Sequence, residues 1–242
     1  MVPRAFLDPL PAGRIEISGA QASYLLRVRR LGGGDEVEIF DGKGRTMPAV
    51  IRVPPGVAKK RQLFVIEPAG EATMHPRPSP LIHLAAAAPK GPRLDWLIEK
   101  IQELGAASFR PLESERSVRA PKSASENERL HAKLVEAARQ SRRNFLTEIG
   151  DTTSLGEIFV EGRRCAINLI LDRSGEPLSK IAAHTKKPDN VLLVVGPEGG
   201  FSAIEISEAL AAGFVAVSLG EGYLRVETAA IAALSAVRVL FP

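Results

Sequence analysis

The chain has 242 residues, of which 45% are hydrophobic and 25% charged, and this composition is typical of one or two soluble globular domains. Its one cysteine, Cys165, excludes an internal disulfide and a cysteine-based zinc site, and the four histidines lack the spacing of metal ligands, so we expect no metal. The first residues lack the apolar run of a signal peptide, and the apolar stretches are too short to span a bilayer. We therefore expect a cytoplasmic protein without membrane association.

Charge is unevenly distributed along the chain, whose formal net charge is +4. Residues 1–150 contain 24 Lys and Arg against 17 Asp and Glu, whereas residues 151–242 contain 8 against 11. The excess of basic residues in 1–150 favours contact between this part of the chain and a polyanion, and chance scatter of charges is the alternative.

The first 70 residues predict a small β-barrel. Compact or alternating apolar patterns predict strands at 14–17, 36–40 and 63–66, with a turn at 41–44 and a short helix at 25–31. Three prolines then follow within residues 72–80, and each restricts itself and the residue before it to extended geometry. We place a domain boundary there, between a domain 1–72 and a domain 73–242.

In the second domain, predicted strands alternate with helices, which favours an α/β fold with a mostly parallel sheet. The apolar patterns predict strands at 81–88, 108–112, 166–171, 191–195 and 215–219. They also predict helices at 94–104, 125–143, 203–212 and 228–240. Capping boxes at Ser125–Glu128 and Ser202–Glu205 mark the start of two of these helices.

A glycine-rich loop, Gly196-Pro197-Glu198-Gly199-Gly200, follows the strand at 191–195 and precedes a helix. Open α/β sheets bind ligands at such places, because glycine lets the backbone come close to the ligand. The loop lacks the Gly-Lys-Ser/Thr ending of a phosphate loop and the glycine spacing of a dinucleotide site. A tight structural turn is the alternative interpretation.

A second segment, residues 219–229, also links a buried strand to a helix, and the two loops together could line one pocket. Thr228 is the expected N-cap, with free N–H groups behind it. Arg225 is a candidate for chemistry, and a solvated salt bridge between Arg225 and Glu227 is the alternative.

These two segments resemble the SPOUT class of methyltransferases, in which the C-terminal chain forms a trefoil knot. The chain is most similar to one SPOUT family, the 16S ribosomal RNA (uracil-N3)-methyltransferases. The similar stretches include Pro89-Lys90-Gly91, Ser114-Glu115-Arg116-Ser117, the loop 196–200 and residues 224–229, and in the barrel Pro3-Arg4-Ala5-Phe6. The resemblance covers nearly the whole chain and implies a PUA-like RNA-binding barrel followed by the knotted α/β domain.

The resemblance implies S-adenosyl-L-methionine as the cofactor. The implied cofactor-binding residues are Leu171, Gly196, Pro197, Glu198, Gly199, Gly200, Leu219, Gly220, Tyr223, Leu224, Arg225, Thr228 and Ala229. The implied RNA contacts are Arg4, Arg27, Arg30, Lys90 and Arg116.

Methyl transfer to uracil N3 requires removal of the N3 proton, which calls for a base or for a cation that stabilises the resulting anion. Arg225 is the candidate cation, because a guanidinium can grip carbonyl or phosphate oxygens with two donors. Glu198 is the candidate base, although a carboxylate at a helix start also complements the helix dipole. Because N3 lies on the Watson–Crick edge, the target uridine must be unpaired or flipped out.

The implied partners are 16S ribosomal RNA or the small subunit, and a second copy of the chain through the knot domain. The final helix, with Ile231 and Leu234, suits a dimer face, and packing on its own sheet is the alternative. Three rival functions stay open: a SPOUT enzyme acting on a ribose 2′-hydroxyl or another base, a non-catalytic RNA-binding module, and a nucleotide-dependent enzyme.

Overall fold

The structure is a computed structural model that describes residues 2–18, 22, 24–25, 31–52, 64–113 and 124–242. The chain divides into two units, Met1–Arg77 with Ala138–Leu146 and Pro78–Ala137 with Thr147–Pro242. The division after Arg77 falls inside the proline-containing stretch 72–80. The assignment of Ala138–Leu146 to the first unit differs from the expected domain 73–242, which had placed this segment in the second.

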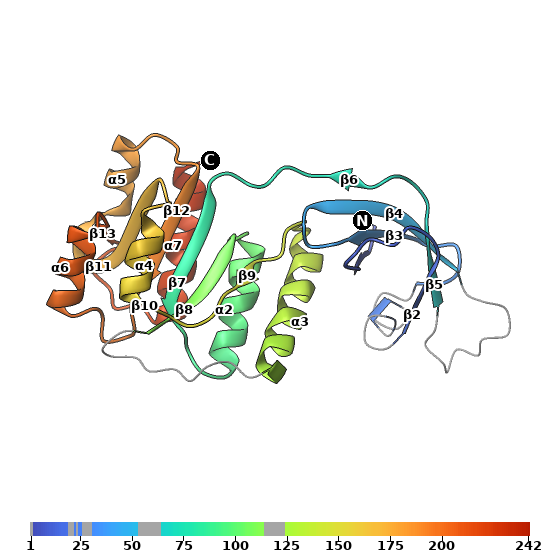
Figure 1. Cartoon of the computed structure of the whole chain (residues 1–242), viewed down its shortest axis with the longest axis horizontal. Coiled ribbons are helices and arrows are strands. Elements are labelled where there is room, and N and C mark those ends of the chain that lie inside the picture. Colours follow the sequence, from blue (N-terminus) through green and yellow to red (C-terminus); the bar gives the residue numbers. More distant parts are fainter. Residues whose placement is uncertain (1, 19–21, 23, 26–30, 53–63, 114–123) are drawn as a thin grey trace. The chain divides into compact units, whose positions relative to one another are not determined.

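The first unit is built on one six-stranded sheet (Figure 1). Its strands are β1 (Arg4–Phe6), β2 (Ile15–Ile17), β3 (Glu36–Phe40), β4 (Arg45–Arg52), β5 (Phe64–Pro68) and β6 (Thr73–Met74). The order is β1-β3-β4-β5-β2, with β6 beside β4, and only the pair β1 and β3 is parallel within the described part of this sheet. The strands expected at 14–17, 36–40 and 63–66 are present, whereas the helix expected at 25–31 lies largely outside the described residues.

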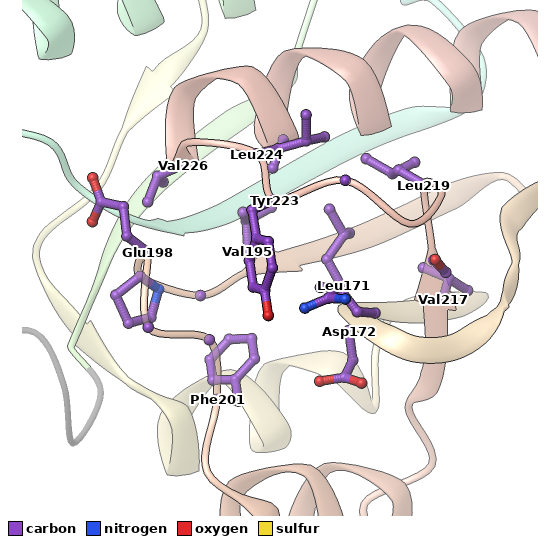
Figure 2. A pocket seen from close by; sticks show the side chains of 18 of the residues that line it. Leu171, Asp172, Val195, Glu198, Phe201, Val217, Leu219, Tyr223, Leu224 and Val226 are labelled. Carbon is purple, nitrogen blue, oxygen red and sulfur yellow. The ribbon is translucent and has the colours of Figure 1, made fainter.

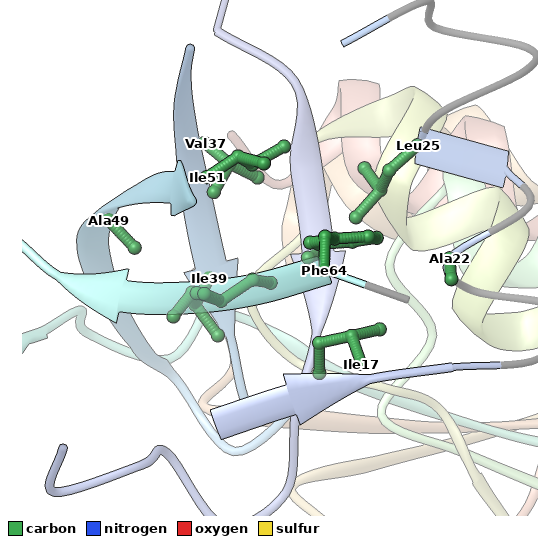
Figure 3. Packing of buried hydrophobic residues seen from close by; sticks show 10 residues of the cluster. Ile17, Ala22, Leu25, Val37, Ile39, Ala49, Ile51 and Phe64 are labelled. Carbon is green, nitrogen blue, oxygen red and sulfur yellow. The ribbon is translucent and has the colours of Figure 1, made fainter. Parts of the chain in front are cut away.

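Alternating side chains of these strands form the core of the first unit. Val37 and Ile39 of β3 and Ala49 and Ile51 of β4 are at most 1% exposed and pack with Phe64 of β5 (Figure 3). Burial of such apolar side chains stabilises the sheet by about 1.5–3 kcal/mol for each large one.

Segment Ala138–Leu146 belongs to the first unit because the predicted turn at 41–44 holds it. The N–H of Leu146 donates to the carbonyl of Gly42 at 2.8 Å, and the N–H of Gly44 donates to the carbonyl of Asn144 at 3.0 Å. Gly44 has a φ of +101°, and a side chain there would overlap the ring of Phe145. The glycines of this turn therefore serve the packing of a distant segment.

The second unit contains a seven-stranded sheet in which every described pair is parallel (Figure 1). The strands are β7 (Leu81–Ala87), β8 (Ser108–Glu113), β9 (Glu148–Ile149), β10 (Thr153–Ser154), β11 (Ile167–Pro177), β12 (Asn190–Val195) and β13 (Val215–Ser218). Their order is β10-β8-β7-β12-β11-β13, with β9 beside β8. All five strands predicted in this domain are present.

Helices cover both faces of this sheet. They are α2 (Pro92–Glu103), α4 (Leu155–Gly162), α5 (Leu178–His184), α6 (Ala203–Ala211) and α7 (Val226–Leu240). Helix α3 (Ala124–Ser141) begins in the second unit, and its residues from Ala138 on belong to the first. Ile158 of α4 and Ala209 of α6 pack on Val194 of β12 in one core cluster. Helix α7 packs on β7 and β12 and contacts α2 and α5. Strands buried on both faces carry continuous apolar runs, which is why their sequence revealed them.

Two helix starts were predicted from capping boxes. At α6 the Ser202 hydroxyl accepts from the N–H of Glu205, and the Glu205 carboxylate accepts from the N–H of Ser202, so this prediction is confirmed. The helix predicted to open at Ser125 is present as α3, but Ser125 is not its N-cap, because the described helix already includes Ala124. A third box, Ser154 with Glu157, starts α4 and was not predicted.

Arg238 anchors the C-terminal end of α7. Its guanidinium donates to the carbonyls of Pro80 at 2.7 Å, Leu104 at 3.2 Å and Gly105. Three backbone acceptors from the start of β7 and the end of α2 are thus satisfied by one side chain. This fixes α7, whose first turn borders the cavity described next.

Candidate cofactor cavity

The carboxyl ends of β11, β12 and β13 surround a cavity of about 400 Å³ in the second unit (Figure 2). This volume lies in the range of about 300–1,000 Å³ found for small-molecule sites. The strands are neighbours and parallel, so the segments that follow them lie at one edge of the sheet. The two glycine-bearing loops singled out in the sequence therefore do line a common cavity.

Eleven of the thirteen predicted cofactor-binding residues line this cavity. They are Leu171, Gly196, Pro197, Glu198, Gly199, Gly200, Leu219, Gly220, Tyr223, Leu224 and Ala229. The structure adds residues that the sequence had not indicated: Asp172, Arg173, Ser174, Val195, Phe201, Val217, Ser218, Gly222 and Val226.

The glycines of the two loops meet specific backbone needs. Gly200 has a φ of +68° and Gly220 a φ of +119°, conformations that side-chain-bearing residues rarely adopt. A side chain at Gly196 would stand 3.0 Å from the Phe201 ring, which packs beneath the loop. Glycine at these positions sets the shape of the cavity wall.

Arg225 and Thr228 are the two predicted residues that do not line the cavity. The prediction of Thr228 as N-cap is wrong, because α7 begins at Val226 and Arg225 is its N-cap, without a side-chain cap bond. Both side chains are exposed. Arg225 nevertheless stands between two lining residues, Leu224 and Val226, and so lies at the rim.

Glu198 lines the cavity, but its carboxylate belongs to an ion-pair cluster. Its Oε1 lies 3.2 Å from Nη1 of Arg93, and that nitrogen lies 3.8 Å from Oε1 of the buried Glu227. Figure 2 shows the Glu198 carboxylate at the edge of the pocket, directed away from Leu171 and Asp172. Arg93 thus links the glycine loop to the first turn of α7.

Residues Asp172, Arg173 and Ser174 reach the cavity because β11 carries a bulge. The pairing of β11 with β13 shifts register between Leu171 and Glu176, and bulges of this kind redirect side chains. The N–H of Ser174 donates to Asp172 Oδ1 at 2.8 Å. The Arg173 guanidinium lies over the Tyr223 ring, 3.8 Å from its centroid.

The predicted RNA contacts fall into three groups. Lys90 is exposed just after β7, at the same edge of the sheet as the cavity. Arg27, Arg30 and Arg116 lie outside the described residues.

Arg4 was also predicted to contact RNA, but it is only 3% exposed. Its guanidinium pairs with Glu38 at 2.6 Å and donates to the Arg143 carbonyl and to Asn144. Burial lowers the pKa of the Arg4 guanidinium, and Glu38 acts in the opposite direction. Arg4 therefore holds the first unit together, and we exclude it from the RNA-contacting set.

The described residues contain no group of three or more His, Cys, Asp or Glu side chains arranged to hold a metal ion. Within the same part of the chain, no helix is both long and apolar enough to cross a membrane.

Comparison with known proteins gives matches along the chain. A model of the RNA methyltransferase domain matches residues 76–238, and a model of the RNA methyltransferase PUA domain matches residues 17–55. Ribosomal RNA small subunit methyltransferase E from Synechocystis is 35% identical, over 93% of this chain and 73% of that protein.

Two solved structures of similar proteins cover nearly the whole chain. Ribosomal RNA small subunit methyltransferase E from Neisseria gonorrhoeae, bound to S-adenosyl methionine, has a TM-score of 0.84 at 28% identity, over 100% of this chain and 98% of that one. A Legionella pneumophila protein in complex with the same cofactor has a TM-score of 0.82 at 30% identity, over 99% and 98%. They confirm the expected fold class, a PUA-like barrel before an α/β domain of the SPOUT class. The chain therefore belongs to the ribosomal RNA small subunit methyltransferase E family of RNA methyltransferases.

Proposed function

We propose that this protein transfers the methyl group of S-adenosyl-L-methionine to N3 of a uridine in 16S ribosomal RNA. The observation that carries the proposal is the glycine-lined cavity at the ends of β11, β12 and β13. Family membership supports the reaction, and relatives of similar structure have this cofactor bound.

The cavity fits an adenosyl cofactor by its shape and by its chemistry. Leu171, Val195 and Leu224 supply apolar walls for a flat base. The loops 196–200 and 219–224 supply backbone groups, which glycine leaves accessible. When bound, the cofactor supplies an electrophilic methyl group on a sulfonium, which requires no metal.

The chain's own residues must make uracil N3 nucleophilic. The N3 proton leaves to a base, the N3 electron pair forms the new bond to the methyl carbon, and the carbon–sulfur bond breaks with its electrons on sulfur. Glu198 is our candidate base, from the cavity rim beside Arg93. Arg225 is our candidate for stabilising the uracil anion or a neighbouring phosphate from the same rim.

RNA recognition is assigned to the first unit and to the cavity edge. The match of residues 17–55 to a PUA domain supports the first part, and the exposed Lys90 at the sheet edge supports the second. Arg27, Arg30 and Arg116 remain candidate phosphate contacts.

We further propose a cytoplasmic homodimer joined through the second unit. Of the two residues named for a dimer face, Leu234 is fully buried within the chain, so only the half-buried Ile231 stays a candidate. Val239, at the end of α7, is 75% exposed and adds apolar surface.

The full chain is expected to bind S-adenosyl-L-methionine in calorimetry and to methylate unmodified 16S ribosomal RNA or small subunits. Mass spectrometry of the nucleosides should then reveal 3-methyluridine. A methyl group on a ribose or on another base would contradict the assigned acceptor, and failure to bind the cofactor would contradict the enzyme itself.

Replacement of Arg225 by alanine should reduce methyl transfer at least about tenfold, because a charge-assisted contact to the acceptor is lost. The Kd for the cofactor should change by less than about twofold, since this side chain does not line the cavity. Arg225→Lys keeps the charge but loses the two-donor geometry of the guanidinium, so its rate of methyl transfer should lie between those of wild type and Arg225→Ala. Unchanged turnover in Arg225→Ala would end the proposed role.

A further inference from the structure

An arginine–tyrosine stack stands at the mouth of the cavity. Arg173 comes from the bulge in β11 and Tyr223 from the loop after β13, so the stack joins two separate parts of the rim. Figure 2 shows the Tyr223 side chain projecting from its loop across the opening of the pocket.

Tyr223 keeps one face of its ring open. The residue is 82% exposed although a guanidinium covers one face at 3.8 Å, so the opposite face must be largely in contact with solvent. An aromatic ring exposed to this degree is costly to hydrate and suited to stacking. The cation on its covered face also holds the ring in place.

The backbone fixes the position of Arg173. At Gly175 a side chain would come within 2.6 Å of backbone atoms of Ala216 and Val217, so only glycine allows β11 to pass β13 this closely. The resulting bulge directs the segment from Asp172 to Ser174 toward the cavity. Arg173 is therefore presented by a strand rather than by a free loop.

We propose that Tyr223, with Arg173 against its other face, is the platform on which the methyl-accepting uracil stacks after it flips out of the RNA. The inference rests on the proposed function and deepens it, because it names the subsite for the acceptor base. Bases extruded from RNA are held by stacking on aromatic rings and guanidinium planes.

The chemistry of the stack fits a nucleotide. A base offers a flat face to Tyr223, and the attached phosphate is an anion that suits Arg173. The cofactor also carries a flat adenine and a carboxylate, so its binding is measured beside the binding of RNA.

The test compares Tyr223→Ala and Tyr223→Phe in the full chain. Two RNA probes are used: one contains the mapped target uridine, and the other is the same RNA with an abasic site at that position. Wild type should bind the uridine RNA more tightly than the abasic RNA. Tyr223→Ala should lose this preference and raise KM for RNA about tenfold or more, whereas Tyr223→Phe should retain both.

Cofactor binding provides the second measurement. Because Tyr223 also lines the cavity, Tyr223→Ala should lose more affinity for the uridine RNA than it loses for S-adenosyl-L-methionine in calorimetry. A parallel loss of cofactor binding with no loss of uridine preference would overturn the platform and make Tyr223 a cover for the cofactor. Arg173→Ala should lower the affinity for the uridine RNA. A loss of affinity for the cofactor alone, as expected of a residue that binds the cofactor carboxylate, would contradict the proposal.

Arg163→Ala is the matched control, since Arg163 is exposed at the end of α4 and does not line the cavity. This variant should behave as wild type in both measurements. The inference and the proposed function fail in different ways. If wild type binds no cofactor or methylates no uridine, the function is wrong, and if wild type does both but Tyr223→Ala keeps its uridine preference, only the platform is wrong.

Discussion

Gly175→Ala should destabilise the second unit by about 3 kcal/mol or more, the largest effect on stability that we expect from a single methyl group. The new Cβ would lie 2.5 Å from the carbonyl carbon of Ala216 and 2.6 Å from the nitrogen of Val217. These are backbone atoms of β13, which cannot rotate away as a side chain can. Strands β11 and β13 would have to separate, and chemical denaturation should show a clearly lower midpoint.

Gly156→Ala supplies the control for this substitution. Gly156 lies in the first turn of α4, and an added Cβ would meet nothing within 4 Å. Alanine is a better helix former than glycine by about 1 kcal/mol, so this variant should be as stable as wild type or slightly more stable. If Gly175→Ala unfolded at the same denaturant concentration as Gly156→Ala, the close approach of β11 to β13 would not be required.

Much of the second unit could be predicted because its strands are buried on both faces. Strands β7, β12 and β13 are short apolar runs bounded by glycine or proline, and the glycine loops that follow them stand out for the same reason. The cavity could then be predicted from the strand arrangement, since loops at the carboxyl ends of neighbouring parallel strands converge at one edge of the sheet.

The bulge in β11 could not be predicted from its residues. The stretch 172–177 contains Asp, Ser, Gly and Pro, a composition typical of a turn that ends a strand. The strand instead continues to Pro177, because Gly175 lets it pair with β13 beyond the bulge. Arg173 was missed as a cavity residue for this reason, and its position depends on a tertiary contact that no local pattern encodes.

Three further omissions have different causes. The sequence before α4 contains a capping box, Ser154 to Glu157, so this helix was predictable and was overlooked. Strand β4 contains Pro48, and a proline argues against a strand in the middle of a sheet. The packing of Ala138–Leu146 against the turn at 41–44 joins residues about a hundred positions apart, and a single sequence gives no sign of such a pairing.

Gly220→Val should weaken cofactor binding roughly a hundredfold while leaving the protein folded. Gly220 has a φ of +119°, a conformation that costs a β-branched residue about 3 kcal/mol. Its Cβ would meet no atom within 4 Å, so the cost is one of backbone conformation and not of collision. In the free protein Gly220 is held by two solvent-exposed hydrogen bonds with the Ser218 hydroxyl, at 3.1 and 3.2 Å, which water can replace when the backbone relaxes to a negative φ. The strain returns when the cofactor demands the original shape. Calorimetry with S-adenosyl-L-methionine measures the loss.

Gly213→Val separates this effect from general strain. Gly213 also has a positive φ, +88°, and open space around its Cβ, but it ends α6 and does not line the cavity. Hydrogen bonds on both sides, from its own N–H to Leu210 and from Phe214 to Ala209, prevent the backbone from relaxing. Strain at Gly213 should therefore lower the free energy of unfolding and leave the Kd for the cofactor unchanged. Strain at Gly220 should raise the Kd for the cofactor and leave the free energy of unfolding unchanged. Equal Kd values for the two variants would mean that the loop after β13 is not shaped for the cofactor.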